Sequence, residues 1–253
     1  MVRKYLRTSE IANAVGCHPN TVRLYVDWGY IPQVKRSKSN YRLFTGNHLE
    51  HMKLARISFG GNYPGRTLRR SATSVVKKAA AGDLGGAIEL AYSHLALVQF
   101  EQAQADMAAT LLERWSQGIV TDATVGPRLI GETAAILNVT KDLLRNWENN
   151  GLIEVPRAAN GYRVFQAKEL GRLRVIRMLS RTGYSMMAIL RMLIAFDLGM
   201  TKDLPEILDT PDETEDIYSA ADQWLSTLNI EEVKANNLIN QLEKMIKTKS
   251  VPI

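Results

Sequence analysis

The sequence contains one segment twice, and this repeat constrains the fold more than any other feature. Five residues of the first copy recur 122 positions later, namely Glu10, Ala12, Arg23, Gly29 and Ile31 as Glu132, Ala134, Arg145, Gly151 and Ile153. Six more recur 121 positions later, namely Tyr41, Arg42, Phe44, Leu49, Arg56 and Tyr63 as Tyr162, Arg163, Phe165, Leu170, Arg177 and Tyr184. Ordered identities around a single one-residue deletion indicate two copies of one structural module, and two copies alone argue against a solenoid.

Each copy has the pattern of two short helices joined by a tight turn. In the first copy, Pro19 suits the first position of a second helix, and Gly29 suits its end. In the second copy, the expected helices cover residues 132–137 and 141–150, and Thr140 caps the latter. A short helix, a turn and a second helix form a helix-turn-helix.

A basic or polar stretch and an alternating strand follow each helix pair. These segments are residues 34–40 and 41–44 in the first copy, and residues 155–161 and 162–165 in the second. The pattern predicts a β-hairpin wing in each copy, with a basic tip, followed by a further helix.

Charge alternates along the chain in step with the repeat. Residues 1–70 carry 13 Lys/Arg and 3 Asp/Glu, and residues 128–193 carry 11 and 5. The intervening residues 71–127 carry 3 and 6, and residues 194–253 carry 5 and 12. Two basic segments favour two places that contact a polyanion such as nucleic acid, whereas an uneven solvated surface is the alternative.

These motifs resemble the MerR family of winged-helix transcription regulators. In the first copy the matching residues are Gly16, Pro19, Thr21, Arg23, Tyr25, Gly29, Ile31, Tyr41, Arg42 and Phe44. In the second copy they are Thr140, Arg145, Trp147, Glu148, Gly151, Leu152, Ile153, Tyr162, Arg163 and Phe165. The chain departs from the family pattern at His18, at Asn146 and at Asp142. The resemblance implies DNA recognition by the second helix and the wing of each module.

Two apolar stripes with three-four spacing lie outside the repeats. One covers residues 87–115, and the other, after a predicted N-terminal cap at Asn229, contains Ala235, Leu238, Leu242 and Met245. Members of the resembled family pair two subunits through antiparallel helices. We therefore expect the stripes to pair within one chain as an antiparallel coiled coil, which makes a pseudo-dimer. Packing of each helix on its nearest module, or a homodimer of two chains, is the alternative.

The expected fold class is mostly α with small β-wings, organised in four segments. Residues 1–70 and 128–195 form the two winged helix-turn-helix modules. Residues 71–127 form a helical linker, and residues 196–253 a helical C-terminal segment.

The candidate DNA-contacting residues lie on the two recognition helices and the two wings. On the helices we expect exposed side chains that reach base edges or phosphates, at Asn20, Thr21, Arg23, Tyr25, Thr140, Lys141, Asp142, Arg145 and Trp147. On the wings we expect phosphate contacts from Arg36, Lys38, Tyr41, Arg42, Arg157, Tyr162 and Arg163. For Tyr41 and Tyr162, packing beneath the wing is an equal alternative.

The expected function is sequence-specific regulation of transcription by a pseudo-dimer that distorts promoter DNA at an imperfect inverted repeat. The alternative is an architectural or excisionase-like recombination accessory protein. The expected partners are double-stranded DNA and RNA polymerase, with no membrane, in the cytoplasm and nucleoid. An enzyme is not expected, because the sequence lacks a Ser/His/Asp set and a glycine-rich phosphate loop. No cofactor or metal is expected either, since Cys17 is the single cysteine and His48 and His51 lack a third ligand nearby.

Overall fold

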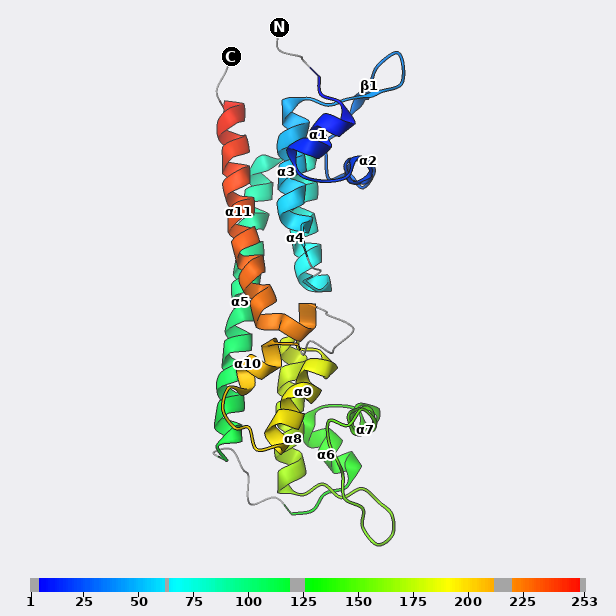
Figure 1. Ribbon diagram of the computed structural model, residues 1–253, viewed down its shortest axis with the longest axis vertical. Coiled ribbons are helices and arrows are strands. Elements are labelled where there is room, and N and C mark those ends of the chain that lie inside the picture. The colour runs from blue at the N-terminus through cyan, green and yellow to red at the C-terminus, as the bar shows by residue number, and fades with distance from the viewer. Residues whose placement is uncertain (1–4, 62–63, 119–125, 212–219, 251–253) are drawn as a thin grey trace. The chain divides into compact units, whose positions relative to one another are not determined.

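The computed structural model describes residues 5–61, 64–118, 126–211 and 220–250, and most of these residues are helical. The chain divides into two compact units, one made from residues 1–100 with 228–253 and the other from residues 101–227 (Figure 1). Each unit contains one copy of the repeat. The two units are described separately.

The first unit contains a helix-turn-helix, a two-stranded wing and four further helical segments. Its elements are α1 (Thr8–Ala14), α2 (Pro19–Asp27), β1 (Lys35–Arg36), β2 (Arg42–Leu43), α3 (Gly46–Phe59), α4 (Arg66–Ala80), the first half of α5 (Leu84–Ser116) and most of α11 (Trp224–Ser250). In the wing, β1 and β2 are antiparallel, with Lys35 opposite Leu43 and Arg36 opposite Arg42. The strand Arg42–Leu43 lies within the predicted segment 41–44.

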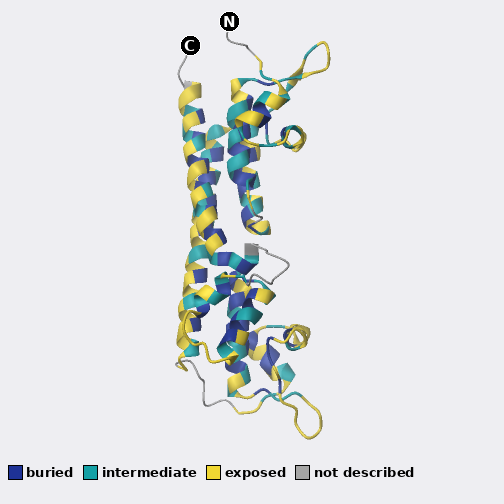
Figure 2. Ribbon diagram, in the orientation of Figure 1, coloured by how far each residue is buried: buried dark blue, intermediate teal, exposed yellow. Residues whose placement is uncertain are grey.

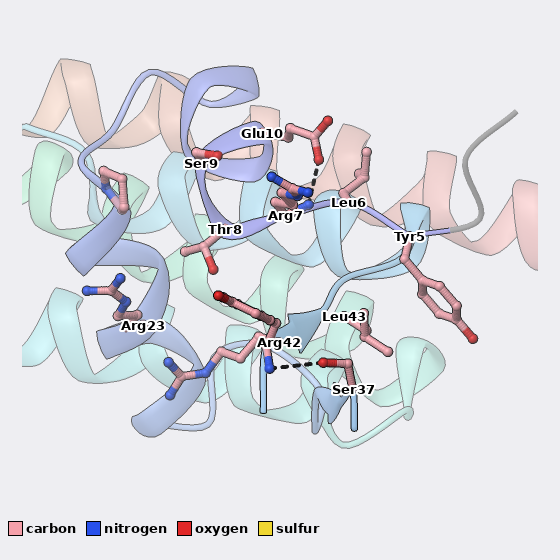
Figure 3. A pocket seen from close by; sticks show the side chains of 12 residues that line it. Tyr5, Leu6, Arg7, Thr8, Ser9, Glu10, Arg23, Ser37, Arg42 and Leu43 are labelled. Carbon is pink, nitrogen blue, oxygen red and sulfur yellow. Dashed lines mark hydrogen bonds between the residues drawn. The ribbon is translucent and has the colours of Figure 1, made fainter. Parts of the chain in front are cut away.

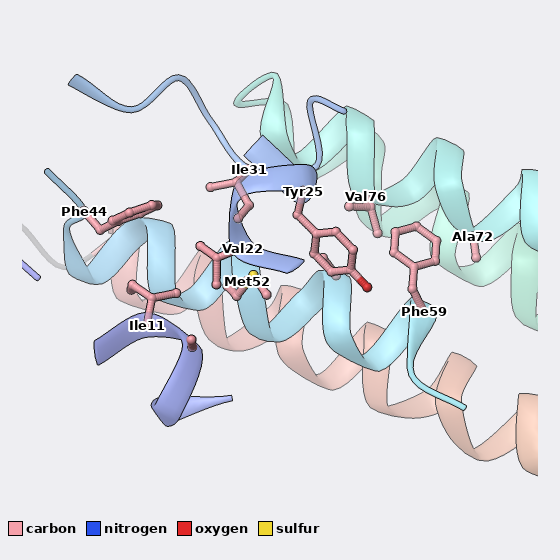
Figure 4. Packing of buried hydrophobic residues seen from close by; sticks show 11 residues of the cluster. Ile11, Val22, Tyr25, Ile31, Phe44, Met52, Phe59, Ala72 and Val76 are labelled. Carbon is pink, nitrogen blue, oxygen red and sulfur yellow. The ribbon is translucent and has the colours of Figure 1, made fainter. Parts of the chain in front are cut away.

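The first module has its own apolar core. Side chains from α1, α2, the wing, α3 and α4 form it together, including Ile11, Val22, Phe44, Met52 and Val76 (Figure 4). Figure 2 shows buried residues along the inner faces of these helices, while much of α2 and the wing is exposed. The core therefore fixes α2 and the wing while leaving their outer surfaces free.

The first half of α5 and most of α11 pack on the same unit through a second core cluster. Its members are Leu54, Val75, Ala79, Ala87, Ala91, Leu238, Ile239, Leu242 and Met245. Early residues of α5 thus meet late residues of α11, and Gln99 further along α5 donates to Glu232 at 3.0 Å. The two segments are therefore antiparallel within this unit, and the predicted stripe of α11 is buried.

Glu50 of α3 links α3 to α11 at the edge of this cluster. Its carboxylate accepts from Gln241 at 2.8 Å and lies 3.2 Å from Lys244 of α11. Burial raises the pKa of Glu50, but hydrogen bonds from Lys53, Gln241 and Lys244 outweigh burial and lower it to about 2. The carboxylate is therefore ionised at neutral pH and holds the two helices together.

The second unit also contains a helix-turn-helix followed by a longer helix, but the further helices that pack on it differ from those of the first unit. Its elements are the end of α5, α6 (Ile130–Leu137), α7 (Lys141–Asn149), α8 (Ala167–Thr182), α9 (Met186–Asp197), α10 (Leu204–Asp209), η1 (Ala220–Gln223) and the start of α11. Two arginines connect them. Arg172 of α8 donates to the carboxylate of Asp197 at 2.7 and 2.9 Å and to the backbone oxygen of Leu152 at 2.7 Å. Arg191 of α9 donates to the backbone oxygens of Ile207 and Leu208.

The predicted second wing is shorter than expected. In place of the strand predicted over 162–165, isolated antiparallel bridges join Arg163 to Arg157 across the hairpin and Phe165 to Arg128. Pro156 occupies the position that Lys35 has in the first wing, and proline has no N–H to donate to the opposite strand. Only the bond from the backbone nitrogen of Val164 to the oxygen of Pro156 forms there, at 2.9 Å.

The predicted helix start at Asn229 is wrong. α11 begins at Trp224 and runs through Asn229 without a break. The carboxylate of Asp209 accepts from the backbone nitrogens of Leu225 at 2.8 Å and Ser226 at 3.0 Å. An acceptor from α10 therefore satisfies the first turn of the helix.

The repeat is also visible in the backbone. Gly16 and Asn138, which are 122 positions apart, are both in the left-handed region, with φ of 59° and 48°. Asn40 and Gly161, which are 121 positions apart, share it at the wing tip, with φ of 64° and 81°. Glycine and asparagine tolerate this conformation best, so the exchanges preserve the turns. Across the described ranges, no helix has the length and apolar character needed to span a bilayer.

Candidate nucleic-acid interface

The first recognition helix, α2, is capped locally and exposes polar side chains at its start. His18 caps it, because its Nδ1 accepts from the backbone nitrogen of Asn20 at 3.2 Å. Asn20 and Arg23 are exposed, and the Arg23 guanidinium donates to the Asn20 side-chain oxygen at 2.7 Å. Thr21 is half-buried. An amide and a guanidinium at the first turns of a helix suit contacts to base edges.

Tyr25 is not exposed as predicted. It is 5% exposed, and its ring packs edge-on against Phe59 at 5.9 Å between centroids. Burial raises the pKa of its phenol, while a hydrogen bond with Arg56 acts in the opposite direction. Tyr25 lies three residues after the buried Val22 and therefore faces the core. Its position in Figure 4 is that of a packing residue.

The second recognition helix, α7, exposes a different set of side chains. Thr140 caps it as predicted, since its hydroxyl accepts from the backbone nitrogen of Leu143 at 3.1 Å. Lys141, Asp142 and Arg145 are exposed. The Arg145 guanidinium donates to the Asp142 carboxylate at 2.6 Å, so this arginine has an anionic partner where Arg23 has a neutral one.

Trp147, the second aromatic candidate, is also buried rather than exposed. It is 2% exposed and lies three residues after the buried Leu144, as Tyr25 does after Val22. The equivalent aromatic positions of the two modules therefore belong to the core, and the polar side chains on the outer face of each helix remain the candidates for DNA contact.

The first wing presents several cations to solvent. Arg36 and Lys38 are exposed, and Arg36 donates to the backbone and side-chain oxygens of Asn40 at 3.1 and 3.2 Å. Arg42 is half-buried and its guanidinium lies 3.1 Å from the carboxylate of Asp27 at the end of α2. This ion pair joins the wing to the recognition helix.

The second wing places two arginines on one carboxylate. Arg157 and Arg163 lie opposite each other across the hairpin. Glu148 of α7 accepts from Arg157 at 3.0 Å through one oxygen and from Arg163 at 2.5 Å through the other. Like charges directly opposite on paired strands repel each other, and the shared carboxylate offsets this repulsion.

Tyr41 and Tyr162 do not pack beneath the wings. They are 75% and 65% exposed, so the packing alternative is wrong for both. Each lies next to the wing arginine at the hairpin tip, Arg42 or Arg163. An exposed aromatic ring beside a cation suits contact with a nucleic-acid backbone or sugar, and this role stays a prediction.

A groove of about 810 Å³ lies between α1, α2 and the wing of the first module (Figure 3). Arg23 and Arg42 line it from α2 and β2. Arg7, Thr8 and Ser9 line it from the start of α1 and were not among the predicted residues. Their signal in the sequence is a basic residue followed by two hydroxyl residues at the start of a helix. Three arginines and the hydroxyls of Thr8 and Ser9 give this otherwise mixed lining groups that can bind a phosphate.

The histidine pair of α3 has no metal-site geometry. Nδ1 of His48 accepts from the backbone nitrogen of Thr45 at 2.9 Å, and His51 is buried. In the described part of the chain, no group of three or more His, Cys, Asp or Glu side chains could hold a metal ion. Both histidines lie in the interior of the first unit.

Each unit thus contains a winged helix-turn-helix, and this architecture defines a class of DNA-binding proteins. Comparison with known families agrees: the family described as MerR HTH family regulatory protein matches residues 6–69 and again residues 129–195. These two ranges cover just over half of the chain, so the protein belongs to the MerR family of DNA-binding transcription regulators. Comparisons with curated proteins and with solved structures give no match.

Proposed function

We propose that the chain is a sequence-specific transcription regulator in which one polypeptide supplies both halves of a MerR-type dimer. The observation that carries this proposal is the pair of recognition helices with different exposed side chains at equivalent positions. The first module offers Asn20 and Arg23, and the second offers Asp142 and Arg145. A homodimer reads the same sequence twice, whereas these helices differ at the matched positions 20 and 142.

The target is therefore an imperfect inverted repeat whose halves are not interchangeable. An amide such as that of Asn20 pairs with adenine, and a carboxylate such as that of Asp142 accepts from cytosine. Each correct pair contributes about 1–3 kcal/mol of discrimination against the wrong base.

The proposed mechanism on DNA is distortion of the promoter between the two modules. The antiparallel packing of α5 and α11 supports a paired-helix arrangement like that of the family dimer. Because both modules belong to one chain, they bind the duplex together, and bending or untwisting DNA changes how its promoter elements align. RNA polymerase at such a promoter is the proposed partner.

The test is selection of bound DNA from a genomic or random pool with the purified full chain, followed by footprinting. The selected site is then compared with two symmetrised sites, each built from two copies of one half. We expect both symmetrised sites to bind at least about tenfold more weakly, which corresponds to roughly 1.4 kcal/mol. Equal binding by either symmetrised site contradicts the proposal.

Sedimentation at two protein concentrations tests the single-chain arrangement. We expect one chain per duplex at both concentrations, and two chains per duplex would favour a homodimer. A footprint over one promoter spacer supports regulation, whereas many clustered sites at an attachment region would indicate the excisionase-like alternative.

A further inference from the structure

Two of the three pairs of equivalent arginines on the recognition helices and wings have different kinds of partner in the two modules, whereas Arg42 and Arg163 each contact a carboxylate. The repeat pairs Arg23 with Arg145 on the recognition helices and Arg36 with Arg157 on the wings. In the first module, Arg23 donates to the amide oxygen of Asn20, and Arg36 to oxygens of Asn40. Both partners are neutral.

In the second module, the partners of the same two arginines are carboxylates. Arg145 donates to Asp142, and Arg157 donates to Glu148. Asp142 is the repeat equivalent of Asn20, so the change from amide to carboxylate occurs at one matched position. The Glu148 side chain is only 15% exposed, so solvent screens its ion pairs less than those of a fully exposed carboxylate.

The surrounding charges differ in the same direction on the wings and on the helix after the third one. The third helix itself is more basic in the second module, where α8 carries five cations (Lys168, Arg172, Arg174, Arg177 and Arg181) and α3 carries Lys53 and Arg56. Lys35 and Lys38 of the first wing correspond to Pro156 and Ala159 of the second. After the third helix of each module, α4 carries Arg66, Arg69, Arg70, Lys77 and Lys78, whereas α9 carries Arg191. The Arg191 guanidinium donates to backbone oxygens inside its own unit.

An arginine that already has a carboxylate partner contributes less to phosphate binding. Affinity for DNA of any sequence depends on cations that neutralise phosphates and release condensed counterions. A guanidinium in an ion pair must first exchange its partner, and the released carboxylate is then repelled by the phosphates.

We propose that the modules act unequally on DNA: the first provides most of the sequence-independent attachment, and Asp142 and Glu148 neutralise the second. The second module then depends more strongly on base sequence for its binding. This inference rests on the proposed DNA-binding function and adds that the two modules contribute differently to it.

The test measures binding of the full chain to a mixed-sequence duplex of about 40 base pairs by fluorescence anisotropy, between about 50 and 200 mM salt. Two matched double variants are compared, Arg23→Gln with Arg36→Gln, and Arg145→Gln with Arg157→Gln. The slope of log K against log salt is negative. We expect the double variant of the first module to reduce the magnitude of this slope by about 2, and the double variant of the second module to reduce it by less than about 0.5. Equal reductions overturn the inference.

A second comparison keeps the inference testable if a double variant loses its fold, which circular dichroism detects. Glu148→Gln frees Arg157 and Arg163, so we expect about fivefold tighter binding to the mixed-sequence duplex, as for roughly one added phosphate contact. The control is Glu154→Gln, which removes the same charge from an exposed side chain of the same module. We expect the control to change affinity by less than about twofold.

Equal effects of Glu148→Gln and Glu154→Gln overturn the inference while leaving the proposed function intact. A wild-type chain without salt-dependent affinity for any duplex contradicts the proposed function itself. The two failures are therefore distinguishable.

Discussion

His51 is a buried histidine that folding keeps neutral. It lies on α3 with 3% of its surface exposed, and its Nδ1 has no hydrogen-bond partner in the structure. Burial, with smaller contributions from His48 and Lys249, lowers its pKa from 6.5 to about 4. Its titration therefore couples the stability of the first unit to pH.

The sign of this coupling follows from the direction of the shift. Because the folded-state pKa lies below the unfolded value, protonation favours the unfolded chain. The stabilisation is fully present above about pH 6.5 and is lost as the pH falls through about 4. Between about pH 7 and 4, we expect the free energy of unfolding to fall by up to about 3 kcal/mol more for the wild type than for His51→Gln. Urea titrations across this range measure it, and parallel curves would contradict it.

At single positions, the sequence predicted exposure better on the polar side chains than on the aromatic ones. Asn20, Arg23 and Arg145 are exposed as expected, because polar residues at the start of a capped helix face solvent. Tyr25 and Trp147 were placed on the same surface, although helical spacing from buried neighbours puts them inside. The spacing of the apolar residues along each helix was therefore enough to predict that Tyr25 and Trp147 are buried.

The carboxylate partners of the wing arginines could not be read from the sequence. Asp27 and Arg42 are 15 positions apart, as are Glu148 and Arg163. Which acid meets which arginine depends on the register of the hairpin and on the angle at which it meets the recognition helix. The packing of the core determines both the register and the angle.

Among the elements, the limits of the recognition helices were predicted well because their signals are local. The observed α2 (Pro19–Asp27) and α7 (Lys141–Asn149) agree with expectation to within a residue or two. The predicted start of α11 was wrong because the signal for it is not local: the acceptor for its first turn is Asp209, which precedes the helix in another element. The shortened second wing was predictable in principle, because Pro156 is visible in the sequence.

The turn between α8 and α9 depends on a glycine that tolerates no side chain. Gly183 has a φ of 118°, and a Cβ there would lie 2.6 Å from the ring of Trp224. We expect Gly183→Ala to destabilise the second unit by about 3 kcal/mol, since backbone strain and overpacking add. Chemical denaturation measures this loss.

Gly199 provides the matched control for this substitution. It has a φ of 88°, and no atom lies within 4 Å of an added Cβ. Gly199→Ala therefore carries the strain without the clash, and we expect a cost of about 1 kcal/mol. Equal losses at the two glycines would show that the contact with Trp224 is unimportant.

On the scale of the whole molecule, the first unit is assembled from two distant stretches of chain. Leu238, Leu242 and Met245 of α11 complete a core that also contains Leu54 and Val75. The sequence indicated that the region of α11 is amphipathic, and its apolar stripe is indeed buried. It could not indicate which surface covers the stripe, because that depends on contacts between residues far apart in the chain.

This assembly predicts that a substitution near the C-terminal end weakens the N-terminal module. We expect Leu242→Ala to destabilise the first unit by about 2–5 kcal/mol, because the side chain is fully buried. Hydrogen exchange with mass spectrometry should show faster exchange in α3 and α4 and little change in α8. Leu173→Ala, which removes an equally buried leucine from α8, should produce the reverse pattern, and uniform acceleration in either variant would argue against separate cores.

The split composition of the first unit also has a consequence for biosynthesis. A ribosome translates residues 1–100 before residues 101–227, yet the part of α11 that covers Leu54 and Val75 is translated only after residues 101–227. Domains generally fold in the order in which they are synthesised. Here the second unit completes its chain segment earlier, and the apolar surface around Leu54 and Val75 stays uncovered until residues 228–250 have been translated.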